Sequence, residues 1–151
     1  MEFQVAVEHF YQKLGRKKIM ALATSLNDHV MVRNVSVIIH EGKILFKTDK
    51  NFRKTKQLLE NSQVAICYWG VQIEGIAINH GLVADQPDQS FQELYQKYWE
   101  KSYNAYPHKE SEILIEVVPK LVEIWDQDQD NKGFQLFIDF EQEKAEIENY
   151  D

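Results

Sequence analysis

The sequence of 151 residues contains a single cysteine, Cys67, and no run of about 18 consecutive apolar residues. One cysteine cannot form an intramolecular disulfide, and no segment is apolar enough over the length of a membrane-spanning helix. The first residues include acids and lack the apolar centre of a signal peptide. We therefore expect the whole sequence to be the mature protein, outside the membrane and in the cytoplasm. Cys67 lies in the apolar run VAICYW and is expected to be buried.

Several sequence motifs of catalysis and ligand binding are also missing. There is no glycine-rich phosphate loop and no nucleophile elbow. The five histidines show no metal-ligand spacing, so no metal site is predicted. Hydrolysis by acid–base catalysis would need a second carboxylate beside Glu74, and none can be paired with it from the sequence. The sequence therefore does not support a hydrolase. No repeat or linker divides the chain, and its length suits one domain over residues 1–151.

Acidic residues outnumber basic ones, 24 to 17, but the two kinds are unevenly distributed. Residues 1–56 hold 11 basic and 5 acidic side chains, whereas residues 57–151 hold 6 and 19. An acidic half would repel a polyanion lying along the surface, so nucleic acid is not an expected partner. A small anion bound at one place in the basic half fits this distribution better.

The hydrophobic pattern predicts three helices and several short strands. Amphipathic spacing predicts helices at 2–14, 51–61 and 88–103, with Asn51 capping the second and Leu58 and Leu59 on its inner side. Segments rich in β-branched and aromatic residues predict strands at 19–25, 30–40, 43–49, 63–69, 71–84, 111–118, 120–126 and 133–140.

Short connections between these strands indicate antiparallel hairpins, and hence an α+β fold with an antiparallel β-barrel flanked by helices. Gly75 and Gly81 suggest bends in the fifth strand, and Pro119 is expected to separate two strands. Trp69 and Trp125 are expected to pack in the core. The acidic tail, residues 141–151, is expected to be a frayed helix or disordered.

Positive charge is concentrated in the stretch FKTDKNFRKTKQLLEN, residues 46–61, which has one acid, Asp49, before its helix. Cations in the first turn oppose the helix dipole and destabilise the helix by a few tenths of a kcal/mol each. Arg53 and Lys54 are therefore unfavourable unless an anion binds there, and a phosphate would suit both side chains. Arg33 interrupts an otherwise apolar strand, and hairpin pairing about residues 41 and 42 would place it across from residue 50. A third cation is thus expected at the same place.

An ordered set of short segments resembles a known family. These segments are ALATS, R-x-V-S, F-x-T-D-K, R-K-x-x-Q-L, N-x-x-V-A, W-x-x-x-x-E-G and VVPKLVEIWD. Together they are similar to the FMN-binding split-barrel proteins related to pyridoxamine 5'-phosphate oxidase, specifically the small general-stress-protein branch. The resemblance implies a split barrel of about six strands and a homodimer with FMN in a cleft at the dimer interface.

The same resemblance assigns expected roles to particular residues. Arg33 and Lys54 would bind the FMN phosphate, with Arg53 assisting. The isoalloxazine and ribityl groups would be lined by Val35, Ser36, Lys47 and Thr48, and the remaining expected cofactor contacts are Asn34, Phe46 and Gln57. Phe52 stands where the family commonly has a small hydroxyl residue, so one hydroxyl contact to the phosphate is missing.

The expected function is that of an FMN-binding flavoprotein acting as a small oxidoreductase on an unknown substrate. Oxidation of pyridoxamine 5'-phosphate itself is not expected, because the acidic C-terminal half lacks the additional basic residues for a substrate phosphate. The alternative is a stress-response module that binds flavin, haem or a deazaflavin without turnover.

Overall fold

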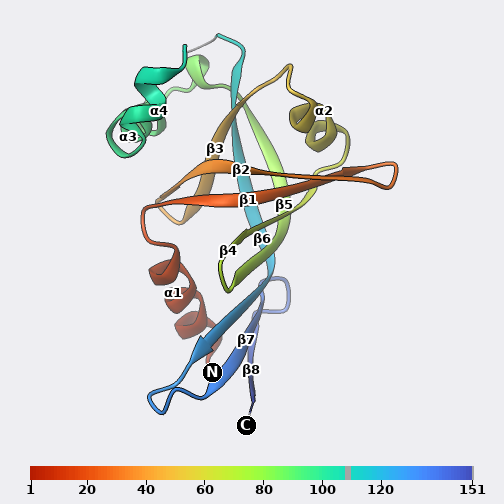
Figure 1. Cartoon of the computed structure of the whole chain (residues 1–151), viewed down its shortest axis with the longest axis vertical. Coiled ribbons are helices and arrows are strands. Elements are labelled where there is room, and N and C mark those ends of the chain that lie inside the picture. Colours follow the sequence, from red (N-terminus) through yellow and green to blue (C-terminus); the bar gives the residue numbers. More distant parts are fainter. Residues whose placement is uncertain (108–109, 151) are drawn as a thin grey trace.

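The computed structural model describes residues 1–107 and 110–150 and shows six antiparallel strands closed into a barrel. These strands are β1 (Lys17–Leu26), β2 (His29–His40), β3 (Lys43–Asp49), β4 (Gln63–Tyr68), β5 (Val71–Leu82) and β6 (Glu112–Gln127). Their order is β3-β2-β1-β4-β5-β6, and pairing of β3 with β6 closes the barrel (Figure 1). The predicted α+β class and antiparallel split barrel are confirmed.

Two further strands, β7 (Gly133–Asp139) and β8 (Lys144–Asn149), continue the sheet from the far end of β6 (Figure 1). The expectation of a frayed or disordered tail over 141–151 is therefore wrong for residues 144–149, whereas residue 151 lies outside the described part. Ile147 pairs with Leu136 and Ala145 with Ile138, so two apolar residues at period two lie opposite buried residues of β7. This alternation was not recognised as a strand in the sequence because the segment is rich in acids, with glutamates at 141, 143, 146 and 148.

Pro119 does not end a strand, because residues 112–127 form one continuous β6. Pro119 pairs with Gly75 and Leu121 with Glu74, which leaves Lys120 as the extra residue of a β-bulge. A proline has no N–H for the ladder and is tolerated at such an irregularity. Gly75 has no space for a side chain, since a Cβ there would lie 2.6 Å from the Val118 carbonyl oxygen.

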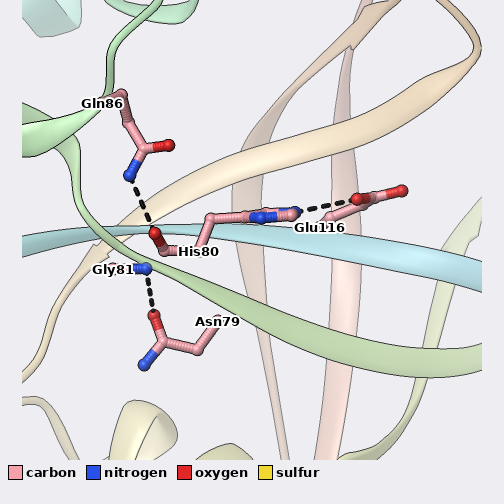
Figure 2. Close-up of polar contacts among 5 residues, drawn as sticks. All are labelled: Asn79, His80, Gly81, Gln86 and Glu116. Carbon is pink, nitrogen blue, oxygen red and sulfur yellow. Dashed lines mark hydrogen bonds and ion pairs between the residues drawn. The ribbon is translucent and has the colours of Figure 1, made fainter.

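A second irregularity, near the end of β5, confirms the bend expected at Gly81. Gly81 has a φ of 90°, and its N–H donates to Oδ1 of Asn79 at 2.8 Å. Nε2 of His80 lies 2.8 Å from Oε1 of Glu116 on β6, and the Gln86 side chain donates to the His80 carbonyl. Both contacts are drawn in Figure 2. These contacts direct the chain through the short 3-10 helix η1 (Val83–Asp85) towards two helices that lie outside the barrel.

Those helices are α3 (Ser90–Tyr98) and α4 (Glu100–Ala105), where the sequence predicted one helix over 88–103. The interruption falls at Trp99, whose φ and ψ of -119° and 43° are not helical. Phe91, Leu94, Tyr95 and Trp99 pack on a cluster separate from the barrel core, formed by Ile38, Leu45, Val83 and Leu114. We call residues 90–107 the lid segment.

The barrel core contains the inward side chains of all six strands, including Met20, Leu22, Phe46, Ile66, Ile73 and Ile115. Helix α1 (Phe3–Leu14) confirms the first predicted helix and adds Ala6, Phe10 and Leu14 to this core. Helix α2 (Arg53–Glu60) buries Thr55 and Leu58. Leu59 is exposed, contrary to prediction, because a helix of two turns presents only a narrow face to the barrel.

Three residues expected to be buried are exposed. Trp69 is 89% exposed in the turn between β4 and β5, with a φ of 48°. Cys67 points outward because Ile66, its neighbour on β4, points into the core. Trp125 lies on the outer side of β6 and stacks on Tyr150, with ring centroids 5.2 Å apart. Within residues 1–107 and 110–150, no helix has the length and apolar character needed to cross a bilayer.

Candidate functional site

The candidate site is a cleft where β2 and β3 separate. They pair only between residues 38–40 and 43–45, although β2 continues along β1 and β3 continues along β6 (Figure 1). Backbone groups of residues 34–36 and 46–48 on the facing strand edges are therefore not paired across the gap. A cavity of about 520 Å³ opens here, lined by residues 34–36 and 47–49, Phe52 and Lys54 near α2, Tyr95, Ser102, Tyr106 and Pro107 of the lid segment, and Glu112.

Arg33 directly precedes Asn34 of the cleft wall; it does not line the cavity itself, but its charge acts on Lys54, and part of its guanidinium is unsatisfied among the described residues. Its Nη1 donates to the Leu22 carbonyl at 3.2 Å and to the Thr24 hydroxyl at 3.0 Å. Its Nη2 is buried and has no hydrogen-bond partner among the described residues. Burial lowers the pKa of Arg33, which shows that the charged form is poorly compensated.

Lys54, the second residue of α2, is a second cation to which the described residues offer the Phe52 ring, 5.3 Å from its Nζ, but no acid. Burial lowers the pKa of Lys54, and the nearby positive charge of Arg33 lowers it further. Two partly desolvated cations therefore lie close together, and the described residues place no acidic side chain between them. Because like charges repel most strongly where water is excluded, the arrangement indicates an anion-binding site.

Gln57 joins the same network through Thr24. The Thr24 hydroxyl accepts from Arg33 and donates to Oε1 of Gln57 at 2.6 Å, which connects β1, β2 and α2. Thr24 belongs to the segment ALATS but was not among the predicted site residues. Thr24 lies on β1 opposite Met31 of β2, two residues along from the pair of Leu22 and Arg33. This position depends on a strand register that the sequence does not specify.

The turn before α2 is held by side chains rather than by the predicted cap, Asn51. The N-cap residue is Phe52, and no side chain caps the helix. Oδ1 of Asp49 accepts from the Asn51 N–H at 2.9 Å, and Oδ2 accepts from the Ser111 hydroxyl at 3.0 Å. The acid that precedes the helix in the basic stretch is thus part of the turn structure.

Thr48 and Thr55 form a buried hydroxyl pair beside this turn. Thr55 donates to the Asp49 carbonyl at 2.7 Å, so at the 3.0 Å contact between the two hydroxyls Thr48 is the donor. The Thr48 proton is already used within the protein. Both threonines are buried, so this pair holds the end of β3 against the start of α2.

The outer wall of the cleft contains an ion pair and an aromatic ring. Nζ of Lys47 lies 3.1 Å from Oε1 of Glu112 and 4.3 Å from the centroid of the Tyr95 ring. Burial raises the pKa of Tyr95, and the negative charge of Glu112 raises it further. The side chains of Ser102 and Ser36 lie near the Tyr95 hydroxyl and act to lower its pKa, but the net shift is upward, so the phenol is kept protonated.

Six of the ten predicted cofactor residues line the cavity, and four do not: Arg33, Phe46, Arg53 and Gln57. The Phe46 side chain packs in the barrel core, because residues 44, 46 and 48 of β3 point inward. Arg53 is exposed to solvent and is not among the residues that line the cavity. Sequence reasoning missed Glu112 and Ser102, whose places depend on pairing of β6 with β3 and on the break at Trp99.

A second cavity, of about 530 Å³, lies on the outer side of the barrel near Glu74, Lys120 and Glu141. It includes Thr24 but none of the unsatisfied cations described above. The cleft between β2 and β3 is therefore the stronger candidate for a ligand site.

The fold and the cleft define a split-barrel protein with a cationic end suited to an anionic ligand. The sequence model described as Pyridoxamine 5'-phosphate oxidase matches residues 6–126, and the chain belongs to this family. A search of proteins with curated functions finds no match.

Solved structures support the same fold. PhzG from Burkholderia lata 383, in complex with tetrahydrophenazine-1-carboxylic acid, has a TM-score of 0.63 and 15% identity, over 99% of this chain and 92% of that one. General Stress Protein 26 from Bacillus anthracis str. Sterne has a TM-score of 0.57 and 16% identity, over 99% and 100%. An FMN-binding protein related to pyridoxamine 5'-phosphate oxidase, from Nostoc punctiforme PCC 73102, has a TM-score of 0.57 and 14% identity, over 98% and 94%.

Proposed function

We propose that this protein binds FMN in the cleft between β2 and β3 and acts as a cytoplasmic oxidoreductase. The observation that carries the proposal is the buried, unpartnered Nη2 of Arg33 beside the desolvated amine of Lys54. An FMN phosphate would supply the missing acceptor and the missing negative charge at once. Membership of the family and the similarity to an FMN-binding protein support the choice of a flavin nucleotide.

The residues of the cleft fit the remaining parts of FMN. The facing strand edges offer unpaired backbone donors and acceptors near Asn34, Val35, Ser36, Lys47 and Thr48 for the isoalloxazine and ribityl groups. Phe46 would contribute through its backbone only, since its side chain is in the core. Gln57 would orient Arg33 through Thr24, and Arg53 would add positive charge from the solvent side.

The flavin would supply the redox chemistry, and the protein would bind, orient and electrostatically tune it. The protonated Tyr95 hydroxyl in the cleft wall is the group best placed to hold a proton near a substrate. The residues of the cleft do not identify the substrate.

A homodimer is also part of the proposal. Val30 and Val32 on β2 are 74% and 67% exposed, and they point away from the barrel on either side of Met31. Figure 1 shows that the hairpin of β1 and β2 projects beyond α2. Val32 directly precedes Arg33 in β2, so the exposed valines lie close in sequence to that cation. A second copy covering this surface would remove them from water and close the cationic end of the cleft.

The first experiment is the visible spectrum of the purified protein, followed by titration with FMN. We expect flavin absorption after purification or saturable FMN binding. A colourless protein whose fluorescence and stability do not respond to FMN would contradict the proposal.

A second experiment separates an enzyme from a binding module. The FMN-loaded protein is mixed anaerobically with NADH or NADPH, and bleaching of the flavin is followed. Reduction, and reoxidation by an added acceptor, are expected for an oxidoreductase. Flavin binding without reduction by either donor would favour the non-catalytic module.

A further inference from the structure

The ion pair between Lys47 and Glu112 lies in the wall of the proposed flavin cleft and is well shielded from water. The side chains of Lys47 and Glu112 are 6% and 18% exposed, and both residues line the cavity. Nζ of Lys47 also lies 4.3 Å from the centroid of the Tyr95 ring, which fixes the amine against the lid segment. Charges in such a shielded place act strongly on a neighbouring ligand because little water screens them.

The sign of the local charge matters for a flavin. Addition of two electrons and one proton converts the neutral oxidised isoalloxazine into an anion, so the oxidised and reduced forms differ by one negative charge at the ring. A free cation beside the ring binds the reduced form more tightly than the oxidised form and raises the reduction potential. A free carboxylate has the opposite effect, whereas a neutralised pair leaves the potential almost unchanged.

We propose that Glu112 neutralises Lys47 at the flavin ring and thereby keeps the reduction potential of the bound flavin lower than the lysine charge alone would make it. Glu112 is thus a positioning residue, which holds the Lys47 amine and reduces its effect on the ring. The inference rests on the proposed FMN site, and it uses contacts that belong to the side chains of this chain.

The register of the barrel supports this role for Glu112. Glu112 begins β6 and pairs with Asp49, and Lys47 pairs with Leu114, so the two charged side chains meet diagonally across the β3–β6 ladder. Lys47 follows Phe46, whose side chain points into the core, and it therefore points outward into the cleft. The pair lies on the opposite strand edge from Ser36, with the unpaired gap between them.

Two single substitutions shift the potential in opposite directions. Glu112→Gln removes the carboxylate charge with little change of shape and leaves Lys47 charged. Reduced FMN should then bind about tenfold more tightly relative to oxidised FMN, which corresponds to a potential about 30 mV higher for the two-electron couple. Lys47→Met leaves Glu112 unneutralised and should lower the potential by a similar amount.

The measurement is the midpoint potential of the FMN-loaded full-length protein, obtained by anaerobic titration against a reference dye. The double variant, Lys47→Met with Glu112→Gln, should return close to the wild-type potential. Lys120→Met removes the cation of another ion pair, with Glu141, whose residues do not line the cleft, and it should leave the potential unchanged, which makes it the matched control. A purely structural role would not produce opposite shifts that cancel in the double variant.

Two results would overturn the inference. Unchanged potentials in both single variants, with FMN still bound, would overturn it and leave the proposed FMN site standing. Absence of flavin binding by the wild-type protein would overturn both. If Glu112→Gln does not fold, Lys47→Met alone decides, because a potential that stays the same or rises contradicts the proposed direction.

Discussion

The hydroxyl of Thr24 on β1 accepts a hydrogen bond from Nη1 of Arg33 on β2 at 3.0 Å. The same hydroxyl donates a hydrogen bond to Oε1 of Gln57 on α2 at 2.6 Å. Thr24 is only 2% exposed, so its hydroxyl is largely shielded from water. One buried oxygen therefore fixes the orientation of the guanidinium whose other nitrogen has no partner in the described structure.

Replacement of Thr24 by valine should lower both stability and FMN affinity. Valine has the same shape but leaves a donor of Arg33 and the Gln57 side chain without this partner, at a cost of about 1–3 kcal/mol in the free energy of unfolding. Urea denaturation of the FMN-free protein measures the first effect, and FMN titration the second. Thr24→Ser keeps the hydroxyl and should stay near wild type in both. Equal behaviour of the two variants would show that the hydroxyl has no such role.

Removal of the two desolvated cations should weaken FMN binding without unfolding the protein. Charge-assisted phosphate contacts contribute about 1.5–3 kcal/mol each, so Arg33→Ala with Lys54→Ala should reduce the binding free energy by several kcal/mol. Isothermal titration with FMN measures the loss, and circular dichroism checks the fold. Lys56→Ala is the control, because Lys56 is an exposed cation on the same short helix. Unchanged affinity in the double variant would refute the phosphate assignment.

The sequence predicted much of this site because its signals were local. The cations of the turn and the start of α2 follow from charge and helix pattern within residues 46–61. The EG turn at residues 41 and 42 correctly fixed the register in which Ile38 lies opposite Leu45 and His40 opposite Lys43. That register, continued, would place Arg33 across from residue 50, as expected, although the ladder ends before it reaches them.

What the sequence did not predict depends on contacts between distant segments. Glu112 reaches Lys47 only because β6 pairs with β3, 65 residues apart at that contact. Tyr95 enters the cleft only because the predicted long helix breaks at Trp99 and packs over Leu45 and Leu114. Lys47 was expected to line the isoalloxazine and ribityl groups, but its carboxylate partner, Glu112, could not be identified from spacing alone.

Lys54 should destabilise the FMN-free protein in a pH-dependent way. Its pKa is lowered in the folded state, so the unfolded chain binds more protons over the interval from the folded pKa to the usual value of 10.5. The penalty from Lys54 is therefore fully present below the folded pKa and disappears as pH rises towards 10.5. Lys54→Met should stabilise the FMN-free protein near neutral pH, and this advantage should shrink in alkaline buffer.

Stability curves of the wild type and Lys54→Met, taken in parallel from neutral to alkaline pH, test this directly. The difference between the two proteins isolates Lys54 from the tyrosines whose pKa values are raised by burial. Saturating FMN should reverse the order near neutral pH, because the phosphate then compensates the amine. A difference that does not change with pH would contradict the prediction.

Phe52 gives the last prediction, because it occupies the N-cap position of α2 with no capping hydrogen bond and is half exposed at the cavity wall. Its ring contacts the Lys54 amine, with the centroid 5.3 Å from Nζ, and so competes with a phosphate for that cation. Phe52→Ser provides a capping hydroxyl, worth about 0.5–2 kcal/mol at such a position, and frees Lys54. We expect a more stable protein that binds FMN more tightly, measured by thermal unfolding and by titration. Phe52→Ala frees Lys54 without supplying the hydroxyl, so its FMN affinity should fall between those of the wild type and Phe52→Ser. If both variants bind FMN more weakly than the wild type, the ring itself contributes to binding, and the hydroxyl is not the missing element of this site.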